Sequence, residues 1–556
     1  MPDVQSFDYV VVGAGASGCV VANRLSADPA ISVLVLEAGQ QDDDARVHDP
    51  AGFVQLWGSD LDWQLLTEPQ PALGNRQVML NQGRVVGGST SLNALMWVRG
   101  NPRNFDAWAA GGADGWAFAD LLPYFKQVEH YGGGASDVRG AGGPVSVLDN
   151  PDPASRSEAF LAGLGELGYD GPHWDYNGVR QEDGAGPLQF SVTREGARAS
   201  AAVAYLDPVR HRPNLTVTTG AHVTRLLCEG TRVVGVEYAR GGRTHQARAH
   251  DEVVVSAGAL HSPKLLMLSG IGPAEHLREH GIPVVADLPG VGQNLQDHLQ
   301  LPVVYASTSE RPLPYLLTGN TLFTSTRDRP GAAPDLQLNF TPAVPAPLEP
   351  VLGIPVPVGI FLPILIQPDS TGSVRLRSAR PQDAPVVDPR YLSEEADLQT
   401  LREAVRIIRE LVATPAMAGQ YRGEIAPGPD VDLDGYIRSQ SSTLWHAVGT
   451  CRMGGDVDAV VDAELRVRGV EGVRVADASV MPTVTSGNTQ AACYVIGEKA
   501  ADLLLRRRPA PVGAAAGTAS ADRPSAVPSI PVPRVRTTAS ARGSAPAPPV
   551  SQVGTS

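Results

Sequence analysis

The chain has 556 residues, 42% of them hydrophobic, which is enough for more than one hydrophobic core. Its formal net charge of −14 argues against general affinity for nucleic acid and favours a small-molecule partner. The four cysteines are widely spaced, with no CxxC pair and no Cys/His cluster. This spacing predicts reduced thiols, no metal site and a cytoplasmic protein, and the first residues do not resemble a secretion signal.

The N-terminal residues predict a βαβ unit that binds a dinucleotide. Within residues 7–37, a buried strand, the turn Gly13-Ala-Gly15-Ala-Ser-Gly18, an apolar helix and a second strand ending in Glu37 follow one another. In this pattern Gly13 permits a tight turn, Gly15 lets backbone N–H groups approach a pyrophosphate, and Gly18 allows close helix–strand contact. Glu37 can bind both ribose hydroxyls and would repel a 2′-phosphate, which favours FAD or NAD over NADP.

Two further glycine-containing blocks indicate close approach of the backbone to a ligand. Residues 83–93 combine glycines and small hydroxyl side chains with Arg84, whose charge can neutralise phosphate. A strand expected at 251–256 is followed by Ala257-Gly258 and by a helix over 262–269, with Pro in its first turn and Gly at its close.

Two segments differ in character from the rest. The charge-free segment 351–368 is interrupted by four prolines, whereas a spanning helix needs about 20 residues with intact backbone hydrogen bonds. We therefore expect no membrane span but extended, buried chain, which either lines an apolar substrate cavity or forms a core strand pair. Residues 509–556 are rich in Ala, Pro and Ser without any aromatic residue, which predicts a disordered tail.

Near the C-terminal end of the expected fold, a histidine loop and an asparagine are candidate catalytic groups. His446 lies in the glycine-containing run 443–454, a short irregular loop that can hold an imidazole at a fixed place beside a ligand. Asn488 precedes a helix expected over 491–504. There it can cap the helix, which is worth about 0.5–2 kcal/mol, or hydrogen-bond a substrate oxygen, and both roles can coexist.

Together these residues resemble the glucose–methanol–choline (GMC) oxidoreductase family. The run 83–106 is similar to that family's first signature, 258–272 to its second, and 288–298 to a further characteristic motif. The resemblance covers about residues 5–506. Asn488 stands where some relatives carry a second histidine, which resembles the choline-oxidising branch.

The resemblance implies an α/β fold with two domains. One is a Rossmann-type FAD-binding domain that is discontinuous in sequence, and the other is a substrate domain built on an antiparallel sheet packed by helices. We expect the FAD-binding domain at 1–150, 196–300 and 440–506, and the substrate domain at 151–195 and 301–439.

The resemblance also implies the cofactor, FAD, and its contacts. Val223 is similar to a backbone contact to adenine, Asp477 and Ala478 to a pair near the pyrophosphate and ribitol, and the segment 93–96 to residues that flank the isoalloxazine. Leu92 stands where choline oxidases carry the histidine that attaches the flavin, so we expect dissociable FAD. The expected FAD-binding residues are Gly13, Gly15, Ala16, Ser17, Gly18, Glu37, Ala38, Arg84, Val86, Gly88, Ser89, Asn93, Ala94, Leu95, Met96, Val223, Ala257, Asp477, Ala478, Asn488 and Thr489.

The implied reaction is oxidation of a primary alcohol to an aldehyde. Neutral His446 accepts the hydroxyl proton, Asn488 steadies the alkoxide, and hydride leaves for flavin N5. Trp445, Trp57 and Trp63 are candidates for an aromatic lining of the substrate pocket, with ordinary core packing as the alternative. The expected substrate residues are therefore Trp445, His446 and Asn488.

Several alternatives stay open at this stage. The electron acceptor is either oxygen or a quinone or redox protein. The stretch 299–337 has no clear carboxylate for a quaternary ammonium ion, which argues against choline, and His298 is expected to be structural. A flavin-containing hydroxynitrile lyase uses the same histidine loop, and a non-catalytic FAD-binding scaffold is the third possibility.

Overall fold

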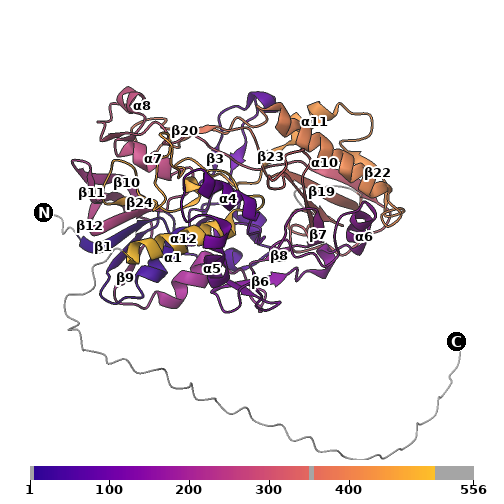
Figure 1. Cartoon of the computed structure of the whole chain (residues 1–556), viewed down its shortest axis with the longest axis horizontal. Coiled ribbons are helices and arrows are strands. Elements are labelled where there is room, and N and C mark those ends of the chain that lie inside the picture. The colour runs from indigo at the N-terminus through magenta and orange to yellow at the C-terminus, as the bar shows by residue number, and fades with distance from the viewer. Residues whose placement is uncertain (1–4, 350–355, 507–556) are drawn as a thin grey trace, which may run out of the picture. The chain divides into compact units, whose positions relative to one another are not determined.

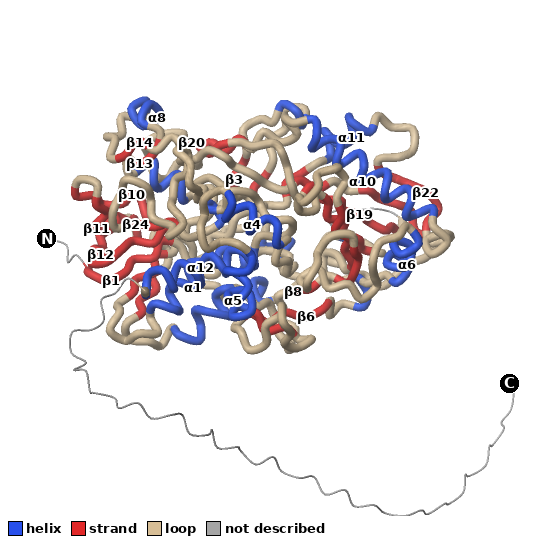
Figure 2. The backbone as a smooth tube through the Cα atoms, in the orientation of Figure 1, coloured by secondary structure: helices blue, strands red, loops and turns tan. Residues whose placement is uncertain are grey.

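The computed structural model describes residues 5–349 and 356–506 (Figure 1). The tail predicted at 509–556 lies outside the described residues. Figure 2 shows the strands gathered mainly in two groups. Strand pairing makes one of them a mainly parallel sheet and the other an antiparallel sheet. None of the helices in the described part combines the length and apolar content needed to cross a bilayer.

The N-terminal residues form the core of a parallel sheet in the order β9-β2-β1-β12-β24. Its valine- and leucine-rich strands are buried on both faces, as parallel strands covered by helices are. The strands β10 and β11 extend the sheet in antiparallel fashion from the first half of β12. The strands are β1 (Gln5–Val12), β2 (Val33–Leu36), β9 (Leu215–Thr218), β10 (His222–Glu229), β11 (Arg232–Arg240), β12 (Arg243–Val255) and β24 (Val473–Val475).

The βαβ prediction is confirmed. α1 (Ala16–Leu25) connects β1 to β2, and Tyr9 to Val12 pair in parallel with Val33 to Leu36. α1 packs directly against α12 (Gln490–Leu505), so the first and last described helices lie side by side (Figure 1). The two ends of the described chain therefore share one hydrophobic core.

The second sheet is antiparallel and follows the order β22-β16-β19-β18-β17-β7, with β15 and β23 joined through β19. Its central strand β19 falls in the charge-free segment, where extended, buried chain was expected; that prediction is confirmed for 358–365. The long amphipathic helix α10 (Glu395–Ala413) packs on β18 and β19. The strands are β7 (Gly184–Pro187), β15 (Leu299–Gln300), β16 (Val303–Ser307), β17 (Asn320–Thr324), β18 (Leu336–Thr341), β19 (Val358–Leu365), β22 (Tyr421–Ala426) and β23 (Ser442–Thr443).

Shorter elements surround these two sheets. The helices are α2 (Ala45–His48), α3 (Phe53–Leu56), α4 (Pro102–Ala110), α5 (Phe118–Val128), α6 (Glu158–Glu166), α7 (Ser262–Leu268), α8 (Ala274–Glu279) and α11 (Leu433–Gln440). The short strands are β3 (Leu65–Leu66), β4 (Met79–Leu80), β5 (Glu129–Tyr131), β6 (Val145–Asp149), β8 (Gln189–Phe190), β13 (Ile271–Gly272), β14 (Ala286–Asp287), β20 (Ser373–Arg375) and β21 (Val386–Asp388).

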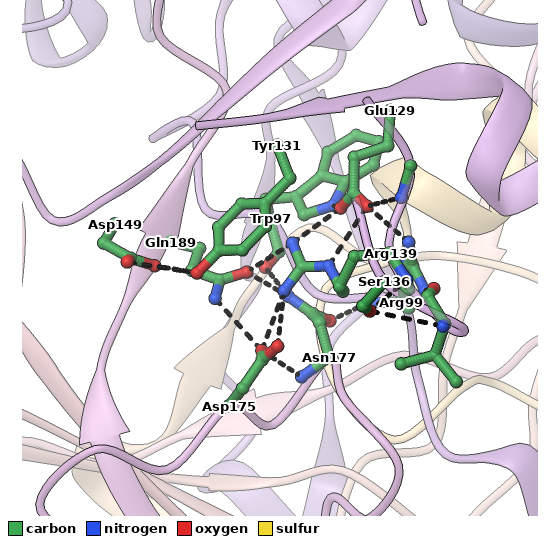
Figure 3. A network of polar contacts seen from close by, with 12 residues as sticks. Trp97, Arg99, Glu129, Tyr131, Ser136, Arg139, Asp149, Asp175, Asn177 and Gln189 are labelled. Atoms are coloured by element: carbon green, nitrogen blue, oxygen red, sulfur yellow. Dashed lines mark hydrogen bonds and ion pairs between the residues drawn. The ribbon is translucent and has the colours of Figure 1, made fainter. Parts of the chain in front are cut away.

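A buried ionic network joins β5 to the segment that follows Met96 (Figure 3). The Glu129 carboxylate is fully buried and accepts hydrogen bonds from the Trp97 indole at 3.0 Å and from Arg139 Nη2 at 2.7 Å, and it also pairs with Arg99. Arg139 continues to Asp175 at 2.8 Å. Because buried charges are tolerated only when they are paired, these side chains fix one arrangement of the chain around Trp97.

Candidate active site

A cavity of about 260 Å³ that opens to solvent extends from the glycine-rich turn after β1 to the histidine loop. It is lined by the predicted cofactor residues, except that Gly18, Arg84 and Val86 are not among the described residues that form its wall. The predicted substrate residues Trp445, His446 and Asn488 line it as well. The structure therefore brings together residues more than 400 positions apart.

The glycine turn is shaped as a cradle. Gly13 has a φ of +99°, which favours glycine, and a Cβ at Gly18 would lie 2.0 Å from the Gly13 carbonyl oxygen. A Cβ at Gly15, by contrast, would meet no heavy atom within 4 Å. The open space beside Gly15 lies at the start of α1, where backbone N–H groups have no partner inside the helix and attract an anion. This site fits a pyrophosphate.

Glu37 marks the ribose end of the cavity. Its carboxylate accepts hydrogen bonds from the N–H groups of Ala14 and Gly39, both at 2.8 Å. Burial raises the pKa of Glu37, although these N–H groups oppose the shift. Each carboxylate oxygen keeps a further lone pair, so Glu37 can still accept from ribose hydroxyls.

Arg198 is a buried positioning residue that sequence reasoning missed. Its guanidinium donates to the Val47 carbonyl at 2.7 Å and to the Asn93 carbonyl and side-chain oxygens at 2.6 and 2.8 Å. Burial lowers the pKa of Arg198 to about 9. Asn93 in turn donates to Gln490 at the start of α12. The predicted isoalloxazine-flanking segment is therefore fixed from two sides, by contacts that no local sequence pattern marks.

His446 lies three residues after β23 and lines the cavity. Its Nε2 lies 3.2 Å from Asn488 Nδ2, and its Nδ1 lies 2.9 Å from Nδ1 of His298. Burial lowers the pKa of His446 to about 3, so the imidazole is neutral near pH 7. His298 was expected to be structural, yet it is in direct contact with the candidate base.

Asp297 anchors the backbone of both histidines. One oxygen of its carboxylate accepts from the N–H groups of His298 at 2.9 Å and His446 at 2.7 Å. The other accepts from the hydroxyls of Tyr391 and Thr443, both at 2.5 Å. Burial raises the pKa of Asp297 to about 6 against the effect of these donors. Sequence reasoning assigned no role to Asp297 or Tyr391.

The cap role considered for Asn488 is wrong. α12 begins at Gln490, so Thr489 occupies the cap position, and no side chain caps the helix. Asn488 is one residue too early to cap and instead directs its amide toward His446. Its Oδ1 is buried and has no hydrogen-bond partner among the described residues. A buried polar atom of this kind costs free energy unless a ligand pairs with it.

The three tryptophans predicted to line the pocket do not form one cluster, since Trp63 packs apart from Trp57 and Trp445. Trp57 and Trp445 are paired with ring centroids 4.6 Å apart, and the Trp445 indole donates to the Met79 carbonyl at 3.0 Å. Trp63 packs instead on His261, with centroids 4.2 Å apart. Trp445 directly precedes the candidate base His446 in the sequence, so the first pair lies beside the histidine loop.

Polar groups suited to metal binding are not clustered in the described part of the chain, where no group of three His, Cys, Asp or Glu side chains could hold an ion. The four cysteines all lie within that part and are free thiols.

Comparison with known proteins identifies the family. Residues 7–300 match the N-terminal model of the GMC oxidoreductases, and residues 368–497 match the C-terminal model. The chain belongs to the GMC oxidoreductase family. The resemblance noted from the sequence is thus confirmed, and with it an α/β fold that contains a Rossmann-type FAD-binding unit.

Relatives of this GMC oxidoreductase cover almost its whole length. It is 41% identical to mitochondrial choline dehydrogenase of Mus musculus, across 90% of this chain and 89% of that protein. It is 38% identical to an alcohol dehydrogenase [acceptor] of Pseudomonas putida, across 90% and 96%. Among solved structures, pyridoxine 4-oxidase from Mesorbium loti is 33% identical with a TM-score of 0.83, across 90% of this chain and 100% of that one. The chain is therefore an FAD-dependent oxidoreductase that acts on CH–OH donors.

Proposed function

We propose that this GMC oxidoreductase oxidises a primary alcohol to an aldehyde, with His446 as the base and Asn488 as its partner. The observation that carries the proposal is the pair itself. The neutral imidazole of His446 faces the amide nitrogen of Asn488, whose oxygen is buried without a partner among the described residues, and both side chains line a cavity that also includes the nucleotide cradle. An alcohol hydroxyl can interact with both groups at once, since Nε2 of His446 and Nδ2 of Asn488 are 3.2 Å apart.

The described residues fit FAD. The space beside Gly15 and the start of α1 would hold the pyrophosphate, Glu37 the ribose, and residues 93–96 the isoalloxazine. When bound, FAD supplies the hydride acceptor, flavin N5. Leu92 is apolar and buried, and it offers no nucleophile for covalent attachment, which supports non-covalent binding.

The side chains of this protein account for the proton. Neutral His446 accepts the hydroxyl proton at the nitrogen that faces Asn488, and the amide of Asn488 donates to the alkoxide that forms. The pKa of His446 is low because of burial, but an alkoxide next to the ring favours the imidazolium and raises that pKa during the step. The Asp297 anchor keeps the loop in place while the charge develops.

The cavity supports an apolar alcohol. Its lining includes Met96, Leu317 and Leu444 together with the paired rings of Trp57 and Trp445. Such a wall suits aryl, furan or medium-chain aliphatic alcohols.

Choline is not favoured, although choline dehydrogenases are among the relatives. The carboxylates that line the cavity, as far as the chain is described, are Glu37 and Asp477. Asp477 already accepts hydrogen bonds from Gly258 N at 2.9 Å and Ser262 Oγ at 2.5 Å. A quaternary ammonium ion would therefore lack a free carboxylate near His446.

The test is anaerobic flavin reduction by a panel of primary alcohols. We expect the oxidised-flavin absorbance to bleach with at least one alcohol of the panel, and the reduction rate to fall on the order of 10²–10⁴-fold in His446→Ala that retains FAD. A wild-type rate in that variant would exclude His446 as the base. Flavin that stays oxidised throughout would favour the hydroxynitrile lyase, tested next by cyanohydrin cleavage, or the scaffold.

Readmission of air then tests whether oxygen, rather than a quinone or redox protein, accepts the electrons. Acid precipitation should release the flavin into the supernatant, whereas colour retained on the protein would contradict non-covalent binding.

The proposal also includes the predicted domain division and a cytoplasmic location. The FAD-binding domain is proposed at 1–150, 196–300 and 440–506, and the substrate domain at 151–195 and 301–439.

A further inference from the structure

His298 and His446 form a pair of neutral rings joined nitrogen to nitrogen. Their Nδ1 atoms are 2.9 Å apart and the ring planes are almost perpendicular, at 85°. One of the two must donate a proton and the other must accept it, because two lone pairs at this distance repel each other. Burial lowers the pKa of both rings, so neither carries a second proton at neutral pH.

The direction of this hydrogen bond decides whether His446 can act as a base. If His446 donates from Nδ1, its Nε2 keeps a lone pair toward Asn488 and the cavity. If His298 donates, His446 must carry its proton on Nε2, and the nitrogen that faces the substrate becomes a donor. A neutral histidine has a single N–H, so these two states exclude each other.

We propose that His298 is a positioning residue that accepts the Nδ1–H of His446 and thereby holds His446 in the tautomer whose Nε2 faces the alcohol unprotonated. The inference rests on the proposed function, since it assigns how the proposed base is prepared. After proton transfer, the same bond becomes a charge-assisted donation from the imidazolium to His298.

The surroundings of His298 favour this direction. As acceptor at Nδ1, His298 must carry its own proton on Nε2. That atom makes no hydrogen bond among the described residues, while the backbones of Ile366 and Thr485 oppose the lowering of the His298 pKa by burial and so favour a proton on this ring. Asn488 supports the same arrangement from the other side, because its Nδ2 is directed toward Nε2 of His446 and donates to a lone pair.

The backbone holds both rings in register. Asp297 accepts from the N–H groups of His298 and His446, and Leu444 N donates to the His298 carbonyl at 2.9 Å. Asp297 lies beside the pair in the sequence and the loop, but its oxygens accept from backbone N–H groups and from the hydroxyls of Tyr391 and Thr443, and not from either ring. The two imidazoles therefore depend on each other, and not on a carboxylate, for their protonation pattern.

The direct test is ¹⁵N NMR of the FAD-loaded protein labelled at histidine. The ¹⁵N shifts separate Nδ1–H from Nε2–H imidazoles, and the His446 signals are those absent from the spectrum of His446→Gln. We expect wild-type His446 to be neutral with its proton on Nδ1. A proton on Nε2 overturns the inference, whatever the catalytic rates are.

Two variants test whether His298 acts as a hydrogen-bond acceptor or only fills space beside His446. His298→Asn places an amide oxygen where Nδ1 lies and preserves an acceptor, whereas His298→Leu fills the site without one. We expect His298→Leu to slow flavin reduction at least ~10-fold, up to the 10²–10⁴-fold contribution of the base, with alcohol affinity unchanged. His298→Asn should recover most of the rate, and the His446 tautomer should follow the same order.

A matched control is His276, another buried histidine, whose Nε2 accepts from Leu376 N. His276→Leu should leave the reduction rate unchanged. Equal rates in His298→Asn and His298→Leu would overturn the inference. Failure of the proposed function has a different signature, because His446→Ala would then reduce flavin at the wild-type rate irrespective of the tautomer.

Discussion

Replacement of Glu129 by glutamine should destabilise the protein by more than any exposed ion pair contributes. In Glu129→Gln the buried guanidiniums of Arg99 and Arg139 lose the carboxylate that compensates them. Breaking a buried pair while leaving the other charge costs about 3–5 kcal/mol. For a chain of this length the entropy of unfolding is roughly 1 kcal/mol/K, so the melting temperature should fall by about 3–5 °C.

The assay is thermal unfolding of the FAD-loaded protein, followed by calorimetry at a fixed scan rate. The matched control is Glu395→Gln, which breaks an exposed pair with Arg402 in which Glu395 is 58% accessible. Exposed pairs contribute about 0–1 kcal/mol, so this control should move the melting temperature by no more than about 1 °C. If the melting temperature fell equally in the two variants, burial would not be the reason that the ion pairs of the Figure 3 network contribute more stability than exposed pairs.

The pH dependence of this effect has a defined sign. Burial alone would raise the pKa of Glu129, but Arg99 and Arg139 outweigh it and lower that pKa. A lowered pKa contributes stability that is present above the unfolded value of about 4.3 and is lost as pH falls through the folded value. The difference between wild type and Glu129→Gln should therefore be constant near neutrality and should shrink below about pH 4. A difference that grows on acidification would contradict the assignment.

Three further predictions concern the cofactor and the base. Gly15→Ala should weaken FAD binding at least ~10-fold in a fluorescence titration and leave the melting temperature of the FAD-free protein unchanged, because its Cβ meets only the space left for the pyrophosphate. Gly18→Ala should instead lower the free energy of unfolding by about 1–3 kcal/mol, because its Cβ would lie 2.0 Å from a backbone oxygen. Arg198→Met removes charged hydrogen bonds to Asn93 worth about 1.5–3 kcal/mol and should raise the FAD dissociation constant ~10-fold or more, whereas unchanged affinity would exclude Arg198 as a support of the flavin segment. Since burial lowers the pKa of His446, the rate of flavin reduction should be flat between about pH 6.5 and 8 and fall only on further acidification; an acid limb at or above pH 6.5, the ordinary histidine value, would contradict this.

Local patterns predicted the parts of the site that depend on local geometry. The strand, glycine turn and helix around Gly13 and Gly18 follow from short-range sterics, so the βαβ unit could be predicted residue by residue. The end of a helix is less well determined by local sequence. The predicted cap position of Asn488 was therefore wrong by a single residue, because α12 begins at Gln490 and Thr489 is the cap.

The missed residues act through long-range contacts. Arg198 binds Asn93 across 105 positions, and Asp297 holds His446 across 149. A lone arginine or aspartate carries no periodicity that marks such a contact, and each is recognised only once the sheets bring the partners together. A purely structural role was predicted for His298 for the same reason, because its spatial neighbour His446 is distant in the sequence.

The two shortest strands of the antiparallel sheet have an evolutionary consequence. β15 starts one residue after His298, β23 ends three residues before His446, and Leu299 pairs with Thr443 across them. The pairing of β15 with β23 thus sets the separation of the two imidazoles. Between these two strands the chain makes an excursion of more than 140 residues that carries most of the antiparallel sheet. Apart from Tyr391, which donates to Asp297, and β19, which pairs with β15, residues of that excursion can be replaced or inserted without moving the two imidazoles, so that new alcohols become accessible to an unchanged chemistry.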